Sequence, residues 1–561
     1  MTGTDGRETV LRYHQRTTHR PGRSAPGPGF LDWASQPDPF RTYQGAARVE
    51  LPLAGADLVA SWGGLHQPGA VASRPLDRAS LGAFFELALG LTAWKEYRGS
   101  RWALRANPSS GNLHPTEGYA FLADAPGVPP GVYHYVSRDH VLERRLSPSP
   151  AGVASLGQLL PRDGFLVGLT SIHWREAWKY GERAFRYCQH DVGHALGGVR
   201  YAAAALGWSA RLLKAPGDDD VSSLLGLDRA PDLAGLDPHD REHPDGLLLV
   251  APPGEIDDGD RRIESALGAL RDVVREGAWA GRPNALSADH VDWPAIAEVA
   301  AASAKPRTAR GVAPTPEAPS ASAIESSAGG PGETLPASAL IRRRRSAVAM
   351  DGETGLTAPA FFAILDRLLP RPGVPPCDVL PWPPRVHPVL FIHRVDELDP
   401  GIYLLERDPR AHGPLRAALR SAFSWERPAG CPQGLRLFRL EKGDARSLAR
   451  FASCQQEIAS DSAFAVAMLG DLGPDLQQEP WWYRRLHWEV GVLGQALYLE
   501  AEVAGVRGTG IGCFFDDVVH EALGLGDERF RDLYHFTIGG PVEDRRLATL
   551  PGYAESVQRR A

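Results

Sequence analysis

Residues 190–204, HDVGHALGGVRYAAA, recur 297 positions later as residues 487–501, HWEVGVLGQALYLEA. Both stretches have apolar residues at helical spacing, which predicts a long buried helix in each place. Five residues are identical between the two copies at matching positions: His190, Leu196, Gly197, Tyr201 and Ala204 in the first copy. The sequence therefore predicts that the chain is built from two related halves.

Further matches occur in the same order along both halves. They pair Phe84-Phe85 with Phe361-Phe362, His114-Pro115 with His387-Pro388, Gly131-Val132-Tyr133 with Gly401-Ile402-Tyr403, Asp218-Asp219 with Asp516-Asp517, and Leu225-Gly226-Leu227 with Leu523-Gly524-Leu525. A repeat period of roughly 270–298 residues is too long for a solenoid unit and corresponds to a whole domain. A duplicated domain is therefore expected.

Residues 304–334 are rich in Pro, Ala, Ser, Thr and Gly and lack apolar periodicity, which predicts a flexible linker. Around it, predicted helices alternate with short predicted strands, so the expected fold class is α+β. Helices are expected at 81–92, 175–206 and 483–504, and strands at 117–123, 247–251, 389–393 and 535–539. The predicted domains are 1–255 with an N-terminal segment, 256–334 as helical tail and linker, and 335–561.

The composition excludes several classes of protein. The chain has 561 residues, 43% hydrophobic and 23% charged, which suits two to four globular domains. Its net charge of −7 gives no reason to expect nucleic acid as a partner. No signal peptide and no apolar run long enough for a membrane span is visible, so a cytoplasmic protein without a membrane partner is expected.

Cysteine and histidine spacing gives no metal or disulfide motif. The five cysteines form no CxxC pair, and the 18 histidines form no HExxH motif. No metal site is therefore predicted. His114 and His190 are expected to be a loop residue and a helix-surface residue.

Residues 105–115, RANPSSGNLHP, form a predicted turn before a strand. Small residues let the backbone approach a planar ligand, although an ordinary loop would have the same composition. The stretch resembles the flavin-binding loop of the nitroreductase superfamily, where a Pro-Ser-Ser/Ala-x-Asn turn touches the isoalloxazine ring. That resemblance implies FMN contacts from the following residues: Arg105, Ser109, Ser110, Gly111 and Asn112.

Residues 178–187, WKYGERAFRY, contain an adjacent Lys179 and Tyr180. Such a pair can serve as general base and acid if its pKa values are shifted, and it also suits a solvated basic helix face. The stretch is similar to SagB-type (McbC-like) dehydrogenases, in which a Lys-Tyr pair is the catalytic signature for the oxidation of thiazolines and oxazolines to azoles. Residues 13–20 and 32–43 also resemble the N-terminal segment of that family.

Residues 342–346, RRRRS, offer guanidinium groups beside a hydroxyl, which suits a phosphate and equally a basic surface patch. They resemble the nitroreductase Arg-Arg-Ser-x-Arg motif that holds the FMN phosphate. Arg344, Arg345 and Ser346 match it, whereas Val348 replaces the last basic residue.

Residues 508–517, GTGIGCFFDD, have closely spaced glycines that suit a tight turn or backbone packed against a ligand. They resemble the Gly-rich stretch beside the flavin edge, which implies contacts from Gly510, Ile511 and Gly512. Arg545 lies where the nitroreductase family often adds a phosphate contact, and it equally suits a solvated tail.

The two halves have lost different motifs. The second half has PWPPRVHP at 381–388 instead of PSSGN, and WWYRRLHWEV at 481–490 instead of the Lys-Tyr stretch. The first half has only Arg74 where an Arg-Arg-Ser motif is expected. Because nitroreductase homodimers hold each flavin between both subunits, the resemblance implies an intramolecular pseudo-dimer of two nitroreductase-like, FMN-dependent domains with one composite FMN site.

The expected function is therefore an FMN-dependent dehydrogenase that acts on an azoline-like small-molecule or peptide substrate in the biosynthesis of modified peptides. The resemblance implies a cyclodehydratase or other biosynthetic enzymes as partners. Two alternatives stay open. One is an NAD(P)H-dependent reductase of nitroaromatics, quinones or enones, and the other is a catalytically degenerate binding or scaffold protein.

Overall fold

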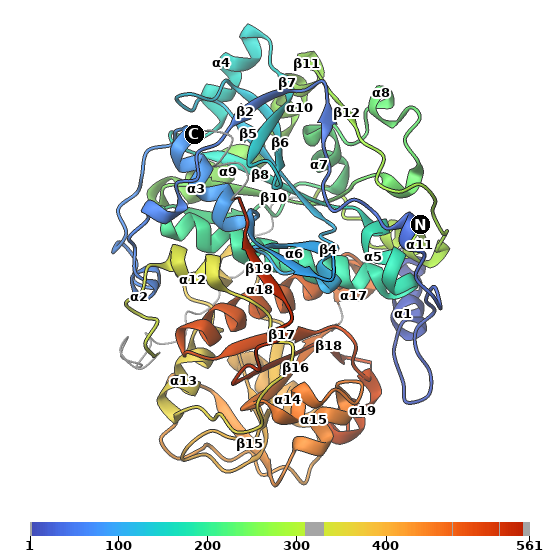
Figure 1. Ribbon diagram of the computed structural model, residues 1–561, viewed down its shortest axis with the longest axis vertical. Helices are drawn as coiled ribbons and strands as arrows, with labels where there is room; N and C mark the ends of the chain where they lie inside the picture. The colour runs from blue at the N-terminus through green and yellow to red at the C-terminus, as the bar shows by residue number, and fades with distance from the viewer. Residues whose placement is uncertain (1–2, 309–329, 474, 527, 554–561) are drawn as a thin grey trace.

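The computed structural model describes residues 3–308, 330–473, 475–526 and 528–553. It has two α+β halves that stack one above the other, with the first half blue to green and the second yellow to red (Figure 1). Residues 304–308 and 330–334 of the predicted linker lie within the described ranges, and 309–329 lie outside them.

Each half contains an antiparallel sheet. The first sheet has the order β11-β7-β6-β5-β8-β10-β9, with β2 beside β7, and the second has the order β15-β14-β13-β16-β18-β17. The first comprises β2 (Ala47–Glu50), β5 (Thr116–Leu122), β6 (Gly131–Val136), β7 (Val141–Ser147), β8 (Phe165–Ser171), β9 (Ser209–Leu212), β10 (His243–Ala251) and β11 (Ala278–Trp279). The second comprises β13 (Val386–Ile392), β14 (Gly401–Leu405), β15 (Leu437–Lys442), β16 (Phe464–Asp471), β17 (Arg507–Ile511) and β18 (Phe530–Gly539). Six strands follow one another in the same chain and spatial order in both sheets, so the predicted duplication and α+β pseudo-dimer are confirmed.

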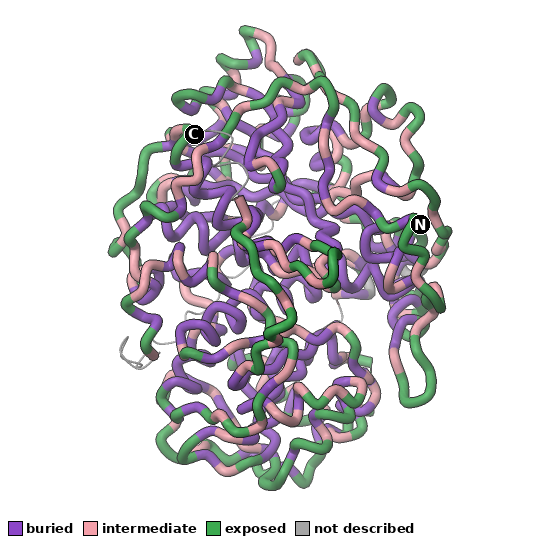
Figure 2. Tube along the Cα trace, viewed as in Figure 1, coloured by how far each residue is buried: buried purple, intermediate pink, exposed green. Residues whose placement is uncertain are grey.

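The two halves meet at the helices α6 (Ala184–Ala205) and α18 (Trp482–Val503), which contain the repeated stretches. Both helices are almost completely buried and cross the middle of the molecule (Figures 1 and 2). Gly193 and Gly491 face each other, and a Cβ on Gly193 would lie 2.3 Å from the Trp488 carbonyl oxygen. The missing side chains let the two helix backbones approach this closely.

The prediction for His190 as a helix-surface residue is wrong. Its side chain is buried and stacks on the equivalent His487, with ring centroids 5.1 Å apart. The helix face that would be the surface of an isolated half is covered by the other half.

Two predicted helices differ from the observed elements. The predicted helix 175–206 is divided into α5 (His173–Tyr180) and α6, because Gly181 between them has a φ of 55°. Instead of one helix at 81–92, the structure has α3 (Arg78–Ala88), which ends before Leu91, followed by β3 (Leu91–Tyr97).

The remaining longer helices are α1 (Gly3–Arg16), α4 (Pro150–Leu159), α7 (Asp218–Leu225), α9 (Ile256–Ser265), α10 (Leu267–Glu276), α11 (Pro294–Ala302), α12 (Ala337–Arg343), α13 (Ala358–Asp366), α14 (His412–Ala418), α15 (Arg446–Ala452) and α19 (Asp516–Leu523). The short ones are α2 (Trp62–Leu65), α8 (Ala230–Leu233), α16 (Glu457–Asp461) and α17 (Asp475–Gln478).

Both ends of the described chain bind the halves together. Tyr13 of α1 packs its ring against Phe185 of the first half and Tyr483 of the second. At the other end, β19 (Ala548–Pro551) leaves the second half and pairs with β3, which also pairs with β4 (Ser100–Arg105). This C-terminal arm crosses the seam at the front of the molecule (Figure 1).

Helices α9 and α10, which belong to the predicted helical tail, pack against the first half, where Ile263 and Leu270 are fully buried. No helix among the described residues is long and apolar enough to cross a membrane.

Candidate functional site

A cavity of about 340 Å³ lies at the seam between the halves. The first half contributes the end of β4 and the loop that follows it, and the second half contributes the residues after α12, parts of α18 and β17, and the C-terminal arm. Its lining includes Lys95, Arg105, Ser109, Ser110, Gly111, Asn112, Arg344, Arg345, Ser346, Val348, Tyr498, Arg507, Thr509, Gly510, Glu543 and Asp544. Nine of the predicted FMN residues therefore come together, although they are up to 405 positions apart in the chain.

The loop after β4 is fixed by its own hydrogen bonds. The backbone N–H of His114 donates to the Ser109 hydroxyl at 2.8 Å, and the buried His114 ring lies 3.0 Å from the Ala103 carbonyl oxygen. Gly111 has a φ of 63°, a conformation that glycine adopts without strain. The loop therefore presents a rigid backbone to the cavity.

Lys179 and Tyr180, at the end of α5, lie against the Gly111 backbone. A Cβ on Gly111 would lie 2.7 Å from the Tyr180 hydroxyl and 3.0 Å from Lys179 Nζ. Burial raises the pKa of Tyr180 well above its usual value, and nearby Glu176 adds to the effect. The Tyr180 hydroxyl therefore keeps its proton at neutral pH and can donate a hydrogen bond.

Arg344 and Arg345 carry positive charge into the cavity without a carboxylate partner among the described residues. Arg344 is buried, donates to the Arg105 carbonyl oxygen at 2.9 Å, and leaves its Nε without a partner. Arg345 donates to Thr92, and burial together with Arg344 lowers its pKa to about 10.

The acidic residues at the cavity are already paired. Glu543 pairs with Arg507 at 2.6 Å, and Asp544 pairs with Arg546 at 2.8 Å. An excess of guanidinium charge therefore remains, and it suits a phosphate group.

Tyr498 links the two remaining predicted motifs. Its hydroxyl lies 2.9 Å from the Ser346 hydroxyl and accepts a hydrogen bond from the Gly510 N–H at 2.9 Å. In the sequence, Tyr498 is distinguished only because it repeats Tyr201.

Three predicted cofactor residues lie outside this cavity, and a fourth lines it with its guanidinium already engaged. Ile511 is buried in the core of the second half, and Gly512 packs against the Tyr187 ring. Arg545 is exposed and is not among the residues that line the cavity. Arg105 lines it, but its guanidinium donates to the carbonyl oxygens of Thr116 and Pro39 at 3.1 and 2.6 Å.

Two buried carboxyl groups lie beneath the loop, and the sequence reasoning missed both. The Ser109 hydroxyl lies 3.4 Å from Glu176, and the Ser110 N–H lies 3.4 Å from Asp191. The second carboxyl oxygen of each has no partner. Burial raises the pKa of both groups, and the charge of Asp191 raises that of Glu176 further. Glu176 precedes Lys179 by three residues, so the two share a helix face. This spacing was the one feature of the sequence that could have indicated that Glu176 belongs to the site.

The stability of the protein is expected to fall as pH rises because of this pair. Burial raises the pKa of Asp191 to about 8, so the folded protein binds this proton more tightly than the unfolded chain, whose Asp has a pKa of about 3.9. The contribution is fully present below about pH 4 and is lost towards pH 8, at no more than about 1.4 kcal/mol per pH unit. Asp191→Asn should flatten this decline in urea denaturation measured across the range. The exposed Asp396→Asn is the control, and an equal slope in wild type and Asp191→Asn would contradict the assignment.

The corresponding region of the second half has a different structure. Residues 381–385 line a separate cavity of about 610 Å³ together with Trp482 and Arg485. Instead of an open Ser/Gly turn, the Trp382 indole N–H donates to Glu489, which forms a buried ion pair with Arg407. The two halves therefore differ in the region that carries PSSGN in the first.

Known proteins provide a comparison for this arrangement. No family model matches the chain. A Methanocaldococcus jannaschii protein named as a nitroreductase is 28% identical over 163 residues, which are 28% of this chain and 79% of that protein. A crystal structure of an Anabaena variabilis protein described as a nitroreductase has a TM-score of 0.65 and 23% identity, and it covers 95% of this chain and 99% of its own.

The match to the Anabaena structure extends over both halves and shows the fold: the chain has the nitroreductase fold twice, as an intramolecular pseudo-dimer. The Escherichia coli microcin synthetase McbBCD complex with truncated pro-MccB17 bound also aligns, over 36% of this chain and 70% of its own, with 17% identity. Its TM-score of 0.27 is too low to support any argument about this chain.

Proposed function

We propose that this chain is an FMN-dependent oxidoreductase with one composite flavin site at its internal seam. The observation that carries the proposal is that the Ser109–Asn112 turn of the first half and the Arg344–Ser346 motif of the second half line one cavity. The nitroreductase fold of both halves supports it, since the family's homodimers hold flavin between subunits.

The chemistry of the cavity fits FMN. Arg344 has a buried Nε without a partner, and neither Arg344 nor Arg345 has a carboxylate among the described residues to neutralise it. A phosphate supplies the missing acceptors and the missing negative charge. The turn at Gly111 offers flat, small-residue backbone suited to a planar ring.

We propose a dehydrogenation with an azoline-like or peptidyl substrate, as in SagB-type enzymes. Bound FMN would supply two-electron redox chemistry by accepting a hydride. Tyr180 stays protonated and donates a hydrogen bond to the substrate, while the Lys179 amine accepts the proton that leaves the neighbouring atom.

A biosynthetic partner and a cellular location follow from a substrate of this class. A substrate of this class arises from a cyclodehydratase, so such an enzyme is the expected biosynthetic partner, and a cytoplasmic location is expected for both.

Arg345→Ser is expected to lower bound flavin from about one per chain to near zero, because the phosphate loses a charge-assisted hydrogen bond in a buried site. The measurement is the flavin absorbance of purified protein relative to chain concentration. Arg343→Ser is the matched control, because Arg343 is half exposed, pairs with Glu502 and does not line the cavity. Unchanged flavin content in Arg345→Ser would overturn the composite site.

Two results would favour the alternative functions. A colourless wild-type protein would favour a binding or scaffold role, and rapid flavin reduction by NAD(P)H alone would favour a reductase.

A further inference from the structure

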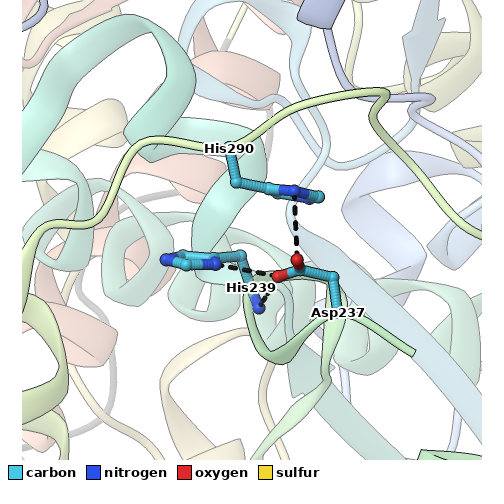
Figure 3. Close-up of side chains that lie close together, drawn as sticks. All are labelled: Asp237, His239 and His290. Carbon is cyan, nitrogen blue, oxygen red and sulfur yellow. Dashed lines mark hydrogen bonds and ion pairs between the residues drawn. The ribbon is translucent and has the colours of Figure 1, made fainter. Parts of the chain in front are cut away.

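Asp237, His239 and His290 meet on the surface of the first half (Figure 3). Asp237 caps the short helix η5 (Pro238–Asp240), and His290 comes from the loop after β12 (Arg282–Pro283). His239 Nδ1 lies 2.8 Å from one Asp237 oxygen, and His290 Nδ1 lies 3.5 Å from the other. We propose that these three side chains bind one divalent transition-metal ion of the Zn²⁺ class.

The far nitrogen of each imidazole already faces a second carboxylate. His290 Nε2 lies 2.9 Å from the fully buried Asp240, and His239 Nε2 lies 3.5 Å from Asp292. A neutral imidazole has one N–H and one lone pair. If Nε2–H donates to the outer carboxylate, the Nδ1 lone pair of each ring faces the Asp237 carboxylate. Two acceptors then face each other, and a cation between them removes the repulsion. Outer carboxylates that orient histidine ligands in this way are typical of metal sites.

Neighbouring groups hold the two rings in place. The rings stack nearly parallel, 5.3 Å apart, and Trp174 packs against both at 5.1 and 6.0 Å. The Trp174 indole donates to Ser287 at 2.7 Å, and the Leu286 N–H donates to Asp240 at 2.9 Å. These contacts fix the orientation of both imidazole rings.

The donor set selects the metal. Two imidazole nitrogens and one carboxylate suit Zn²⁺, Co²⁺ or Ni²⁺, whereas Mg²⁺ and Ca²⁺ prefer oxygen ligands alone. Tetrahedral Zn²⁺ with bonds of about 2.0–2.1 Å separates its ligand atoms by about 3.3 Å. The ligand atoms of the three residues all lie within 4.8 Å of one another, so small side-chain movements suffice, and water completes the shell.

The ion would have a structural role. It would join the loop that contains His290 to η5 across Trp174, at the start of α5. Lys179 and Tyr180 lie at the other end of that helix. The sequence predicts no metal site because His239 and His290 are 51 residues apart, and only the fold brings them together.

The test is titration of the full-length, chelator-treated protein with Zn²⁺ by calorimetry and with Co²⁺ by visible absorption. Wild type is expected to bind one ion per chain and to give the visible Co²⁺ bands of a nitrogen-ligated, four- or five-coordinate ion. His239→Gln and His290→Gln should lose both, and Asp240→Asn should weaken binding about 10–100-fold. Zn²⁺ should raise the Tm of wild type but not that of His239→Gln or His290→Gln.

His412→Gln is the matched control, because His412 also contacts a carboxylate, Glu406 at 2.6 Å, but belongs to no group of three potential metal ligands in the part of the chain that the structure describes. Circular dichroism checks that each variant is folded. If a variant does not fold, the Co²⁺ spectrum of the wild-type protein still tests the site. Wild-type binding no tighter than that of the His239→Gln/His290→Gln double variant, or the absence of Co²⁺ bands, would overturn the site.

Discussion

Lys179→Ala is expected to lower kcat for substrate dehydrogenation about 10²–10⁴-fold, the usual contribution of a positioned acid or base. Lys179 Nζ would be only 3.0 Å from a Cβ on Gly111, so it lies against the loop that lines the proposed flavin cavity. Removing it leaves no amine to accept the substrate proton. Flavin content should stay near the wild-type value, because Lys179 does not line the cavity that contains the phosphate-binding arginines.

Tyr180→Phe separates two roles for the tyrosine. Its raised pKa means that the hydroxyl is a hydrogen-bond donor and not the base. The variant should therefore lower the rate by removing this hydrogen bond, whereas Lys179→Ala should lower it by removing the proton acceptor. Stopped-flow flavin reduction by an azoline-containing peptide measures both. Wild-type rates in Lys179→Ala would show that the pair is only a solvated helix face, as its composition alone allows.

The sequence predicted the local motifs of the site better than the buried environment of its individual side chains. The resemblance to nitroreductase motifs singled out the turn at residues 109–112 and the motif at 344–346, because their composition equally suits an ordinary loop and a basic surface patch. The repeat, together with the resemblance to nitroreductase homodimers, then predicted that they belong to one seam, and both line the same cavity. Whether they hold FMN stays a prediction.

Glu176, Asp191 and Tyr498 could not be predicted in the same way. Their environment depends on burial by segments distant in the chain, and an acidic residue in a helix has the same local pattern whether it is exposed or buried. Arg105 is the opposite case: it matches a predicted FMN contact, but its guanidinium donates to two backbone carbonyl oxygens. No sequence motif reveals these two acceptors. His190 was misplaced because half-chain periodicity cannot show that the second half covers it.

Gly193→Ala is expected to destabilise the protein by about 1–3 kcal/mol, the range for overpacking in a well-packed core. In an exposed helix the same change stabilises by about 0.5–1 kcal/mol, because glycine loses more backbone entropy on folding. At Gly193, however, the new methyl group would lie 2.3 Å from the Trp488 carbonyl oxygen and 2.7 Å from the Gly491 Cα. The helices α6 and α18 must then separate, and the contact between His190 and His487 is lost with them.

Gly157→Ala supplies the matched control, because Gly157 lies in the exposed part of α4 with open space where the Cβ would point. It should raise the urea midpoint slightly while Gly193→Ala lowers it.

Gly491→Ala should destabilise the protein about as much as Gly193→Ala, since its Cβ would lie 2.3 Å from the His190 carbonyl oxygen. Because one separation of the helices relieves both clashes, the double variant should cost less than the two single changes added together. Full additivity would mean that the two glycines do not share one contact. A separated seam also moves Tyr498 of α18 away from the loop of the first half, so flavin content should fall together with stability in both variants.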